Sequence, residues 1–314
     1  MKCIEARSIS KHYHSIIAVD GNDLNIESGQ VFGFLGPNGA GKSTVIKLLT
    51  TLIQPTKGSV SVLGIDSKKH PLDIRKKIGV VLQQPSYEPT LSVEKSLEKY
   101  GMMWDVDRNT RQKRTEELLD SFELQDIRKK RNEDLSIGQR RRVQVAREFM
   151  HDMELLFLDE PTVGLDPSAR RKLLDFLKNK VKETGLTIFY TTHVLTEAEY
   201  LCDNIAIINK GKIITVASPE ELKKRFGHEK TIKIHVSGKN ETLDYLLKNT
   251  PDCKIEFNTD TIITIQSSNS EIILMDILKI LNQNNIPIED LSAMPTNLEE
   301  IFLKVVSDSD ASNN

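Results

Sequence analysis

The chain of 314 residues has few cysteines and no long apolar run. Its three cysteines, Cys3, Cys202 and Cys253, lie far apart and form no CxxC pair, which argues against a disulfide framework and against a zinc site. A reducing, cytosolic compartment fits this usage. The start, MKCIEARSISKHYHS, lacks the apolar stretch of a signal peptide, and no segment approaches the ~18 consecutive apolar residues that cross a bilayer. Any membrane span is therefore expected from another chain.

An excess of charge of either sign is also missing. The 43 basic side chains nearly balance the 45 acidic ones, which gives a net charge of -2. This balance provides no overall attraction to nucleic acid or to an anionic membrane. Two basic runs, IRKKR at 127–131 and RRR at 140–142, have acidic neighbours and no interleaved aromatics for base stacking, so both are expected to be solvated faces. We expect no nucleic-acid partner, and a polyanionic ligand would need a local site.

Short apolar runs alternate with helix-sized segments up to about residue 215. Such runs, rich in Val, Ile, Leu and Phe, are typical of buried parallel strands covered by helices. The sequence therefore predicts an α/β fold. The runs are VFGFL at 31–35, IGVVL at 78–82, LLFLD at 155–159, TIFYTT at 187–192 and IAIIN at 205–209.

Two regions depart from this pattern. Charged helix-like stretches without a strand candidate between 86 and 135 indicate a helical subdomain, about residues 86–150, inserted into the α/β layer. After residue 222, a strand, a helix, a strand pair turning near 258–260 and two helices indicate a small α+β domain, with the ferredoxin-like fold as the candidate. We expect domains at 1–222 and 223–306, and a flexible tail at 307–314.

The stretch GPNGAGKST matches the pattern GxxxxGK[ST] between an apolar strand and an apolar-periodic helix. Its glycines allow the backbone amides to face phosphate oxygens, and the helix N-terminus adds a partial positive charge. Lys42 can reach the β- and γ-phosphates, and Ser43 can offer its hydroxyl to Mg²⁺. The alternative, a glycine-rich turn without a ligand, does not explain the strand-to-helix setting. The predicted loop comprises Gly36, Pro37, Asn38, Gly39, Ala40, Gly41, Lys42, Ser43 and Thr44.

Two carboxylates follow the apolar run of the stretch ELLFLDEP. In open α/β sheets, ligands bind at the carboxyl ends of strands. Asp159 is the candidate Mg²⁺ ligand, and Glu160 is the candidate for orienting or deprotonating an attacking water. An apolar run that ends in two acids is common by itself, so the assignment depends on the phosphate loop.

Together these motifs resemble the ATP-binding cassette (ABC) ATPases, over about residues 1–220 and in the order of the family. The resemblance implies that Gln83 in GVVLQQPS contacts Mg²⁺ and water and signals to a membrane partner, with Gln84 as the neighbouring alternative. It implies that His193 contacts the γ-phosphate, although a lone histidine after a strand is more often a core or surface residue. It further implies that Tyr13 stacks on adenine, where His12 and His14 flank it.

The stretch LSIGQ resembles the family signature, usually LSGGQ, which covers the ATP of a second subunit. Ser136 is a good helix N-cap, and the amides that follow can bind an anion. We expect Ser136, Gly138 and Gln139 to act on the partner's ATP, with Ile137 tolerated because its position needs an N–H only. A Cβ at Gly138 is expected to press on the nucleotide. VGLD resembles the family's loop that links the sites of the two subunits, which implies that Asp166 lies at the dimer junction.

The resemblance is strongest to ATPase subunits of daunorubicin-type drug-resistance exporters, and is weaker in specificity across residues 225–305. It implies ATP hydrolysis with Mg²⁺, a homodimer of ATP-binding subunits, and separately encoded membrane-spanning permease subunits at the cytoplasmic face of the cell membrane. A heterodimer and the opposite direction of transport stay open. The alternatives are an ABC ATPase that acts on ribosomes or DNA, and a non-hydrolysing regulatory module. Only one phosphate loop, a short insertion, and intact Lys42, Asp159 and Glu160 argue against them.

Overall fold

A computed structural model of the protein describes residues 2–84, 86–226, 230–236, 254–259, 262–267, 270–283, 286–294 and 297–311. The chain divides into two compact units, Met1–Ser218 and Pro219–Asn314. The boundary expected at residues 222 and 223 falls inside helix α8 (Pro219–Phe226), which packs against helix α11 (Leu298–Ala311) of the second unit. Within the described residues, no helix has the length and apolar character to cross a membrane.

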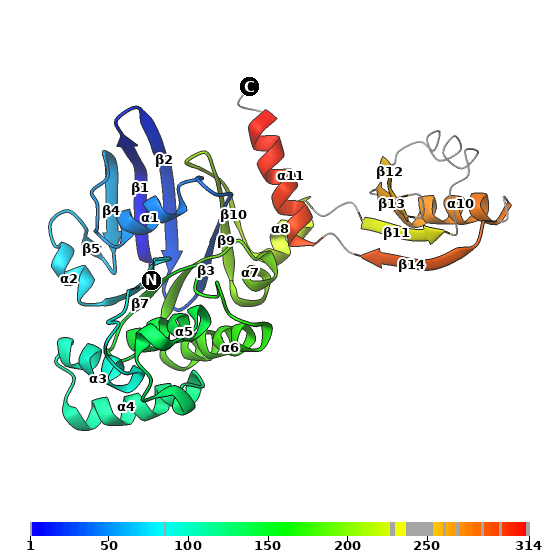
Figure 1. The fold of residues 1–314 in the computed structure, drawn as a ribbon. Helices are drawn as coiled ribbons and strands as arrows, with labels where there is room; N and C mark the ends of the chain where they lie inside the picture. The colour runs from blue at the N-terminus through cyan, green and yellow to red at the C-terminus, as the bar shows by residue number, and fades with distance from the viewer. Residues whose placement is uncertain are drawn as a thin grey trace. The chain divides into compact units, whose positions relative to one another are not determined.

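A six-stranded sheet forms the centre of the first unit (Figure 1), with the order β10-β9-β3-β8-β7-β6. All of its neighbouring pairs are parallel except the edge pair β10–β9. Every residue of β3, β7 and β8 is buried, which explains why the sequence shows continuous apolar runs there. The α/β prediction and its five strands are confirmed. The bounds are β3 (Val31–Leu35), β6 (Ile78–Val81), β7 (Leu155–Asp159), β8 (Thr187–Thr191), β9 (Asn204–Asn209) and β10 (Lys212–Ala217).

A second, antiparallel sheet with the order β2-β1-β4-β5 was not predicted. The pairing of β1 with β2 shifts register four times, and such irregularities interrupt the alternation by which a half-buried strand is recognised. Helix α1 (Lys42–Leu49) contacts strands of both sheets, and its apolar side chains join one core with them. This packing fixes the helix that follows the phosphate loop. The strands are β1 (Lys2–Tyr13), β2 (Ile16–Glu27), β4 (Lys57–Val62) and β5 (Ile65–Asp66).

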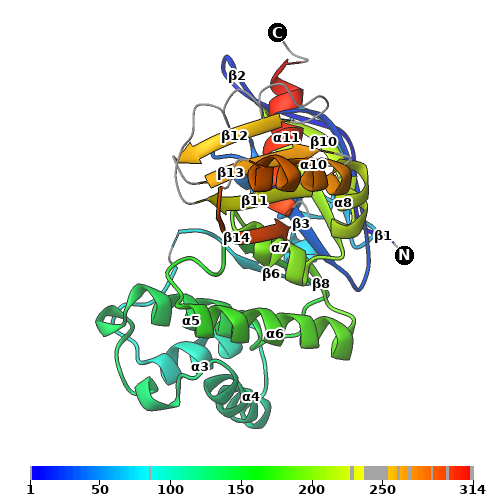
Figure 2. The same cartoon turned by 90° about the vertical axis from the view of Figure 1, so that its right-hand side faces the viewer.

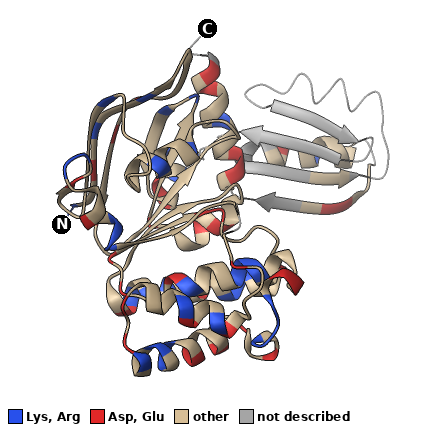
Figure 3. Ribbon diagram, turned by 60° about the vertical axis from the view of Figure 1, so that its left-hand side comes forward, with Lys and Arg blue, Asp and Glu red and all other residues tan. Residues whose placement is uncertain are grey.

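The inserted segment is helical, as predicted, and its helices α3, α4 and α5 group together beside α6 (Figures 1 and 2). Basic and acidic side chains alternate over this region (Figure 3). Arg128 of the first basic run pairs with Glu94 and Glu116, at 2.7 Å each. The helices of the first unit are α2 (Pro71–Arg75), α3 (Val93–Met103), α4 (Arg108–Ser121), α5 (Ile137–Glu148), α6 (Pro167–Thr184) and α7 (Leu195–Leu201), besides α1.

A buried histidine makes the stability of the first unit depend on pH. The ring of His151 stacks on Trp104, with centroids 3.9 Å apart and planes 3° from parallel. Burial lowers the pKa of His151 to about 4. An unfolded chain, with a histidine pKa of about 6.5, binds the proton more readily between these two values, so stability falls as pH falls through this window.

We expect wild type to lose about 2 kcal/mol relative to His151→Phe between pH 7 and pH 5, because phenylalanine keeps the stack but does not titrate. Urea unfolding followed by the fluorescence of Trp104, the single tryptophan, measures this difference. Groups that titrate in the same way in both proteins cancel in this difference. Parallel pH dependences of the two proteins would contradict the assignment to His151.

The second unit contains a four-stranded sheet with the order β12-β13-β11-β14, in which every neighbouring pair is antiparallel. Strand β14 was not predicted. The predicted helix ETLDYLLKN lies outside the described residues, so the ferredoxin-like fold stays a prediction. Helix α11 continues to Ala311, through five residues expected to belong to a flexible tail. The other elements are β11 (Lys230–Val236), β12 (Lys254–Thr259), β13 (Ile262–Ser267), α10 (Ser270–Gln283) and β14 (Ile288–Met294).

Candidate functional site

The phosphate loop connects the end of β3 to the start of α1. Gly41 is the N-cap of α1 with φ 110°, and a Cβ there would lie 2.5 Å from the carbonyl oxygen of Ala18. Only glycine combines this conformation with this close approach. The Nζ atom of Lys42 donates to the carbonyl oxygens of Gly36 at 2.6 Å and of Pro37 at 3.2 Å. The lysine is therefore held inside the loop that is predicted to bind the phosphates of the nucleotide.

Two acidic residues lie near this lysine. Burial lowers the pKa of Lys42, while the charges of Glu160 and Asp159 act in the opposite direction. The two acids therefore favour the charged form of a lysine that burial would otherwise make easier to deprotonate. A charged lysine at this position suits a contact with phosphate oxygens.

Asp159, the last residue of β7, meets the start of α1. Its Oδ2 atom accepts a hydrogen bond from the Ser43 hydroxyl at 3.2 Å, and its Oδ1 atom accepts one from Thr191 at 2.6 Å. A hydroxyl and a carboxylate on a common site are oxygen ligands of the kind that Mg²⁺ prefers. Ser43 and Asp159 thus fit the predicted metal, whereas the amide of Gln83 is engaged by a different carboxylate.

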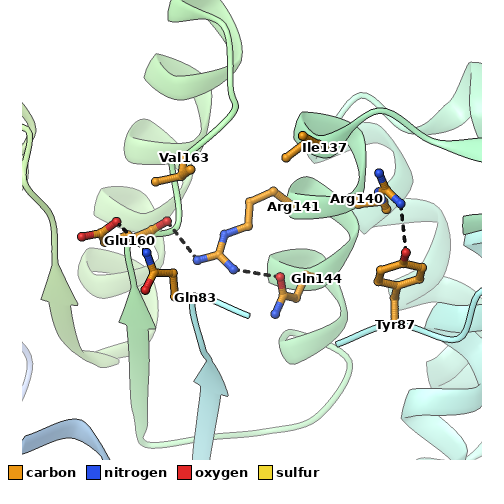
Figure 4. Close-up of a pocket in the computed structure, with 8 residues that line it drawn as sticks. All are labelled: Gln83, Tyr87, Ile137, Arg140, Arg141, Gln144, Glu160 and Val163. Atoms are coloured by element: carbon orange, nitrogen blue, oxygen red, sulfur yellow. Dashed lines mark hydrogen bonds between the residues drawn. The ribbon is translucent and has the colours of Figure 1, made fainter. Parts of the chain in front are cut away.

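The carboxylate of Glu160 brings two other predicted residues together. Its Oε2 atom accepts from the Gln83 amide at 3.4 Å (Figure 4), and its Oε1 atom lies 3.4 Å from Nδ1 of His193. Glu160 has a φ of 51°, a left-handed conformation that costs energy in a non-glycine residue, and its N–H donates to the Thr191 carbonyl at 3.1 Å. Gln83 and His193, from separate loops, therefore converge on the carboxylate of one constrained residue. The side chain of Gln84 does not share this contact.

Tyr13 ends β1, directly opposite Ile16 of β2. Its side chain is 40% exposed, and the ammonium of Lys11 lies 5.3 Å from its ring centroid. The described contact of the ring is with Lys11 and not with the phosphate loop. An exposed aromatic face remains suitable for stacking, so the adenine contact stays a prediction.

The signature stretch forms the first turn of α5. Ser136 and Gln139 make a capping box, in which the Ser136 hydroxyl accepts from the Gln139 N–H and the Gln139 side chain accepts from the Ser136 N–H. The apolar face of α5 is buried through Val143 and Ala146, which fixes the helix against the rest of the first unit. Ile137 is 67% exposed. The helix start is therefore held rigidly while its tip faces outward.

Asp166 caps helix α6. Its carboxylate accepts from the backbone N–H groups of Ser168 and Ala169, at 3.0 Å each. The bond from Ala169 is the main reason why the pKa of Asp166 is lowered. This role within the chain is sufficient to explain the aspartate, and a contact across a dimer stays a prediction.

Residues 19–163 match the family model described as ABC transporter. Over 308 residues the chain is 33% identical to the linearmycin resistance ATP-binding protein of Bacillus subtilis, and the match covers 96% of this chain and 97% of that protein. The chain belongs to the ABC transporter family.

Two further comparisons extend this result. The ABC ATPase is 34% identical to the daunorubicin/doxorubicin resistance ATP-binding protein of Streptomyces peucetius over 96% of its own length and 92% of that protein. It also resembles an ATP-binding cassette whose dimeric structure was solved in a post-hydrolysis state with ADP and phosphate, at 28% identity and a TM-score of 0.64, over 68% of this chain and 98% of that one. The chain accordingly binds and hydrolyses ATP.

The prediction for Arg141, a residue beside the site of this ABC ATPase, was wrong. The run RRR was expected to form a solvated face, but Arg141 is only 6% exposed. Its guanidinium donates to backbone carbonyls around Gln83 and Glu160, and lines a pocket of about 180 Å³ between α5 and these residues (Figure 4). The charge pattern of the sequence could not indicate that Arg141 is buried, because the carbonyls that its guanidinium binds come from loops distant in sequence.

A buried carboxylate also escaped the sequence analysis. Glu197 of α7 accepts hydrogen bonds from the hydroxyls of Thr162 at 2.9 Å, Tyr190 at 2.7 Å and Thr192 at 2.9 Å. Thr162 lies in the same loop as Glu160, and Thr192 directly precedes His193. Glu197 therefore ties the loop that carries Glu160 to the segment that carries His193. No local signal in TEAEY indicates this role.

Proposed function

We propose that this chain is the ATP-hydrolysing subunit of an exporter of drugs, antibiotics or other amphipathic or polymeric substrates. It acts peripherally at the cytoplasmic face of the cell membrane and powers separately encoded membrane-spanning subunits. Support comes from relatives that match nearly the whole chain, including the second unit, and are named for resistance to linearmycin and to daunorubicin and doxorubicin.

In the proposed hydrolysis, Glu160 orients and deprotonates the attacking water, while His193 contacts the γ-phosphate and Gln83 helps to hold the water. The observation that carries this assignment is the convergence of Gln83 and His193 on the two oxygens of the Glu160 carboxylate. Phosphoryl transfer requires mainly positioning and charge neutralisation, and Lys42 supplies positive charge at the β- and γ-phosphates.

Mg²⁺ would be held by Ser43 and Asp159, with Gln83 as the third predicted contact. The metal ion, when bound, neutralises charge that develops on the phosphate oxygens. The chain itself keeps the two oxygen ligands together, because Asp159 is buried and is also bonded by Thr191.

Two copies are proposed to bind head to tail and to enclose two ATP molecules. Ser136, Gly138 and Gln139 of one copy would contact the γ-phosphate of the other, Asp166 would lie at the junction, and Tyr13 would stack on the adenine of its own subunit. The capped helix start of α5 supports this role, since its N–H groups and partial positive charge suit an anion. A structurally similar cassette was solved as a dimer.

Affinity purification from detergent-solubilised membranes tests the transport assignment. We expect the tagged chain to co-purify with a membrane-spanning protein, and the complex to hydrolyse ATP faster than the isolated chain, because the spanning subunit orders the dimer. Lys42→Ala should retain the spanning protein but lose the ATPase activity. Co-purification with ribosomes or DNA, and with no membrane protein, would favour the alternative of an ABC ATPase outside transport.

A further inference from the structure

We propose that Arg141 is a positioning residue that couples the partner-facing start of α5 to the hydrolytic residues of its own chain. The proposal rests on the head-to-tail dimer proposed above, in which Ser136 meets the ATP of the other copy. Arg141 lies on the same helix, between that half-site and the loops of Gln83 and Glu160 (Figure 4). A displacement of α5 therefore reaches both loops through one guanidinium.

The guanidinium of Arg141 binds four main-chain carbonyl groups. Nη1 donates to the carbonyl oxygen of Leu82 at 2.7 Å. Nη2 donates to the carbonyl oxygens of Asp159 and Glu160, the latter at 2.9 Å, and Nε donates to that of Pro161 at 3.3 Å. These carbonyls lie at the end of strand β7 and in the loops that follow the paired strands β6 and β7. One side chain thus fixes the spacing between the two loops.

The guanidinium is suited to this task by its geometry and its charge. Burial lowers the pKa of Arg141 to about 10, so the group remains charged near pH 7. A buried charge is costly unless its donors are satisfied, and a planar fork of five N–H donors satisfies several carbonyls at fixed angles. Lysine keeps the charge but has a single nitrogen, so it cannot bridge both loops in the same way.

Three further side chains of α5 hold the segment that carries Gln83. Their spacing of three or four residues places them along one face of the helix. Among these four side chains, Arg141 is the one that also reaches the carbonyls around Glu160. The other bonds run from Arg140 to the Tyr87 hydroxyl at 2.9 Å, from Gln144 to the Gln84 carbonyl at 3.3 Å, and from Arg147 to the Ser86 carbonyl.

The test compares Arg141→Lys with Arg142→Lys, a matched control on the same helix. Arg142 donates only within the helical insertion, to the carbonyls of Phe122 at 2.9 Å and Glu123 at 3.2 Å. We expect Arg141→Lys to lower kcat by at least about tenfold while KM for ATP changes less than about threefold, because buried carbonyls lose their donors but the phosphate loop is untouched. Arg142→Lys should leave both constants within about twofold of wild type.

Two outcomes would overturn the proposal. Equal kcat values for the two variants would show that Arg141 does not position the hydrolytic residues. Parallel losses in kcat, in ATP affinity and in the thermal midpoint would show a general structural role. If Arg141→Lys does not fold, Arg141→Gln replaces it, since the amide keeps one donor nitrogen without a buried charge.

A dimerisation assay separates this proposal from the dimer itself. Adding Arg141→Lys to Glu160→Gln should leave ATP-dependent dimerisation intact, because the Ser136 half-site is unchanged. Loss of dimerisation only in the double variant contradicts the positioning role. Failure of Glu160→Gln alone to dimerise contradicts the dimer, while the change in kcat still reports on Arg141.

Discussion

Glu160→Gln is expected to lower ATP turnover roughly a thousandfold, the range in which a general base contributes to a rate. The amide retains the size of the side chain and can still contact Gln83 and His193, but it cannot accept a proton from water. ATP should therefore bind and remain unhydrolysed, and the protein should accumulate as an ATP-bound dimer. Steady-state phosphate release and size-exclusion chromatography with light scattering measure these two effects.

Glu154→Gln is the matched control for this variant. Glu154 directly precedes strand β7, and its carboxylate pairs with Lys77 at the surface, 2.6 Å away. An exposed ion pair contributes little to stability, so this change should leave turnover and assembly close to wild type. A Glu160→Gln protein that hydrolyses ATP like wild type and stays monomeric with ATP would refute the role of Glu160.

Gly138→Asp should abolish ATPase activity, with turnover reduced by at least about a hundredfold. A Cβ at Gly138 would lie 2.5 Å from the carbonyl oxygen of Gly164, a backbone atom that cannot move aside cheaply. The sequence suggested that this Cβ would press on a nucleotide, but the nearer obstacle is the loop of the same subunit that leads to Asp166. The added carboxylate would also repel an anion at the start of α5. Turnover and ATP-dependent dimerisation should both be lost.

Ile137→Gly serves as the comparison for Gly138→Asp. The Ile137 side chain is exposed, and the helix N-cap beside it is retained, so the change removes little packing. Glycine lowers helix propensity by about 1 kcal/mol, and less at the first helical position. Turnover should stay within about threefold of wild type. The reverse ranking of the two variants would show that LSIGQ is only a helix cap.

Much of the fold was predictable because its signals are local. The runs at 31–35, 155–159 and 187–191 are buried on both faces, and so they remain continuous in sequence. The first antiparallel sheet was missed for the opposite reason. Strand β1 mixes buried and exposed positions irregularly, and its register shifts make sense only against strands β2 and β4.

The candidate site shows the same division. The bend at Gly41 and the cap at Ser136 depend on a few consecutive residues, and the structure has both. Arg141 was misread as part of a solvated basic run, because its partners at Leu82 and Glu160 are distant in sequence. Glu197 was missed for the same reason.

The sequence by itself determined the α/β class, the phosphate loop, the acidic strand end and the family of this protein. These features depend on the order of neighbouring residues, which set local backbone geometry and the burial of short runs. Only the tertiary structure decided how Gln83 and His193 meet at Glu160, and which main-chain carbonyls satisfy Arg141. Those contacts join separate loops at the ends of neighbouring strands, and hydrogen bonds of about 3 Å form only once the sheet has brought these ends together.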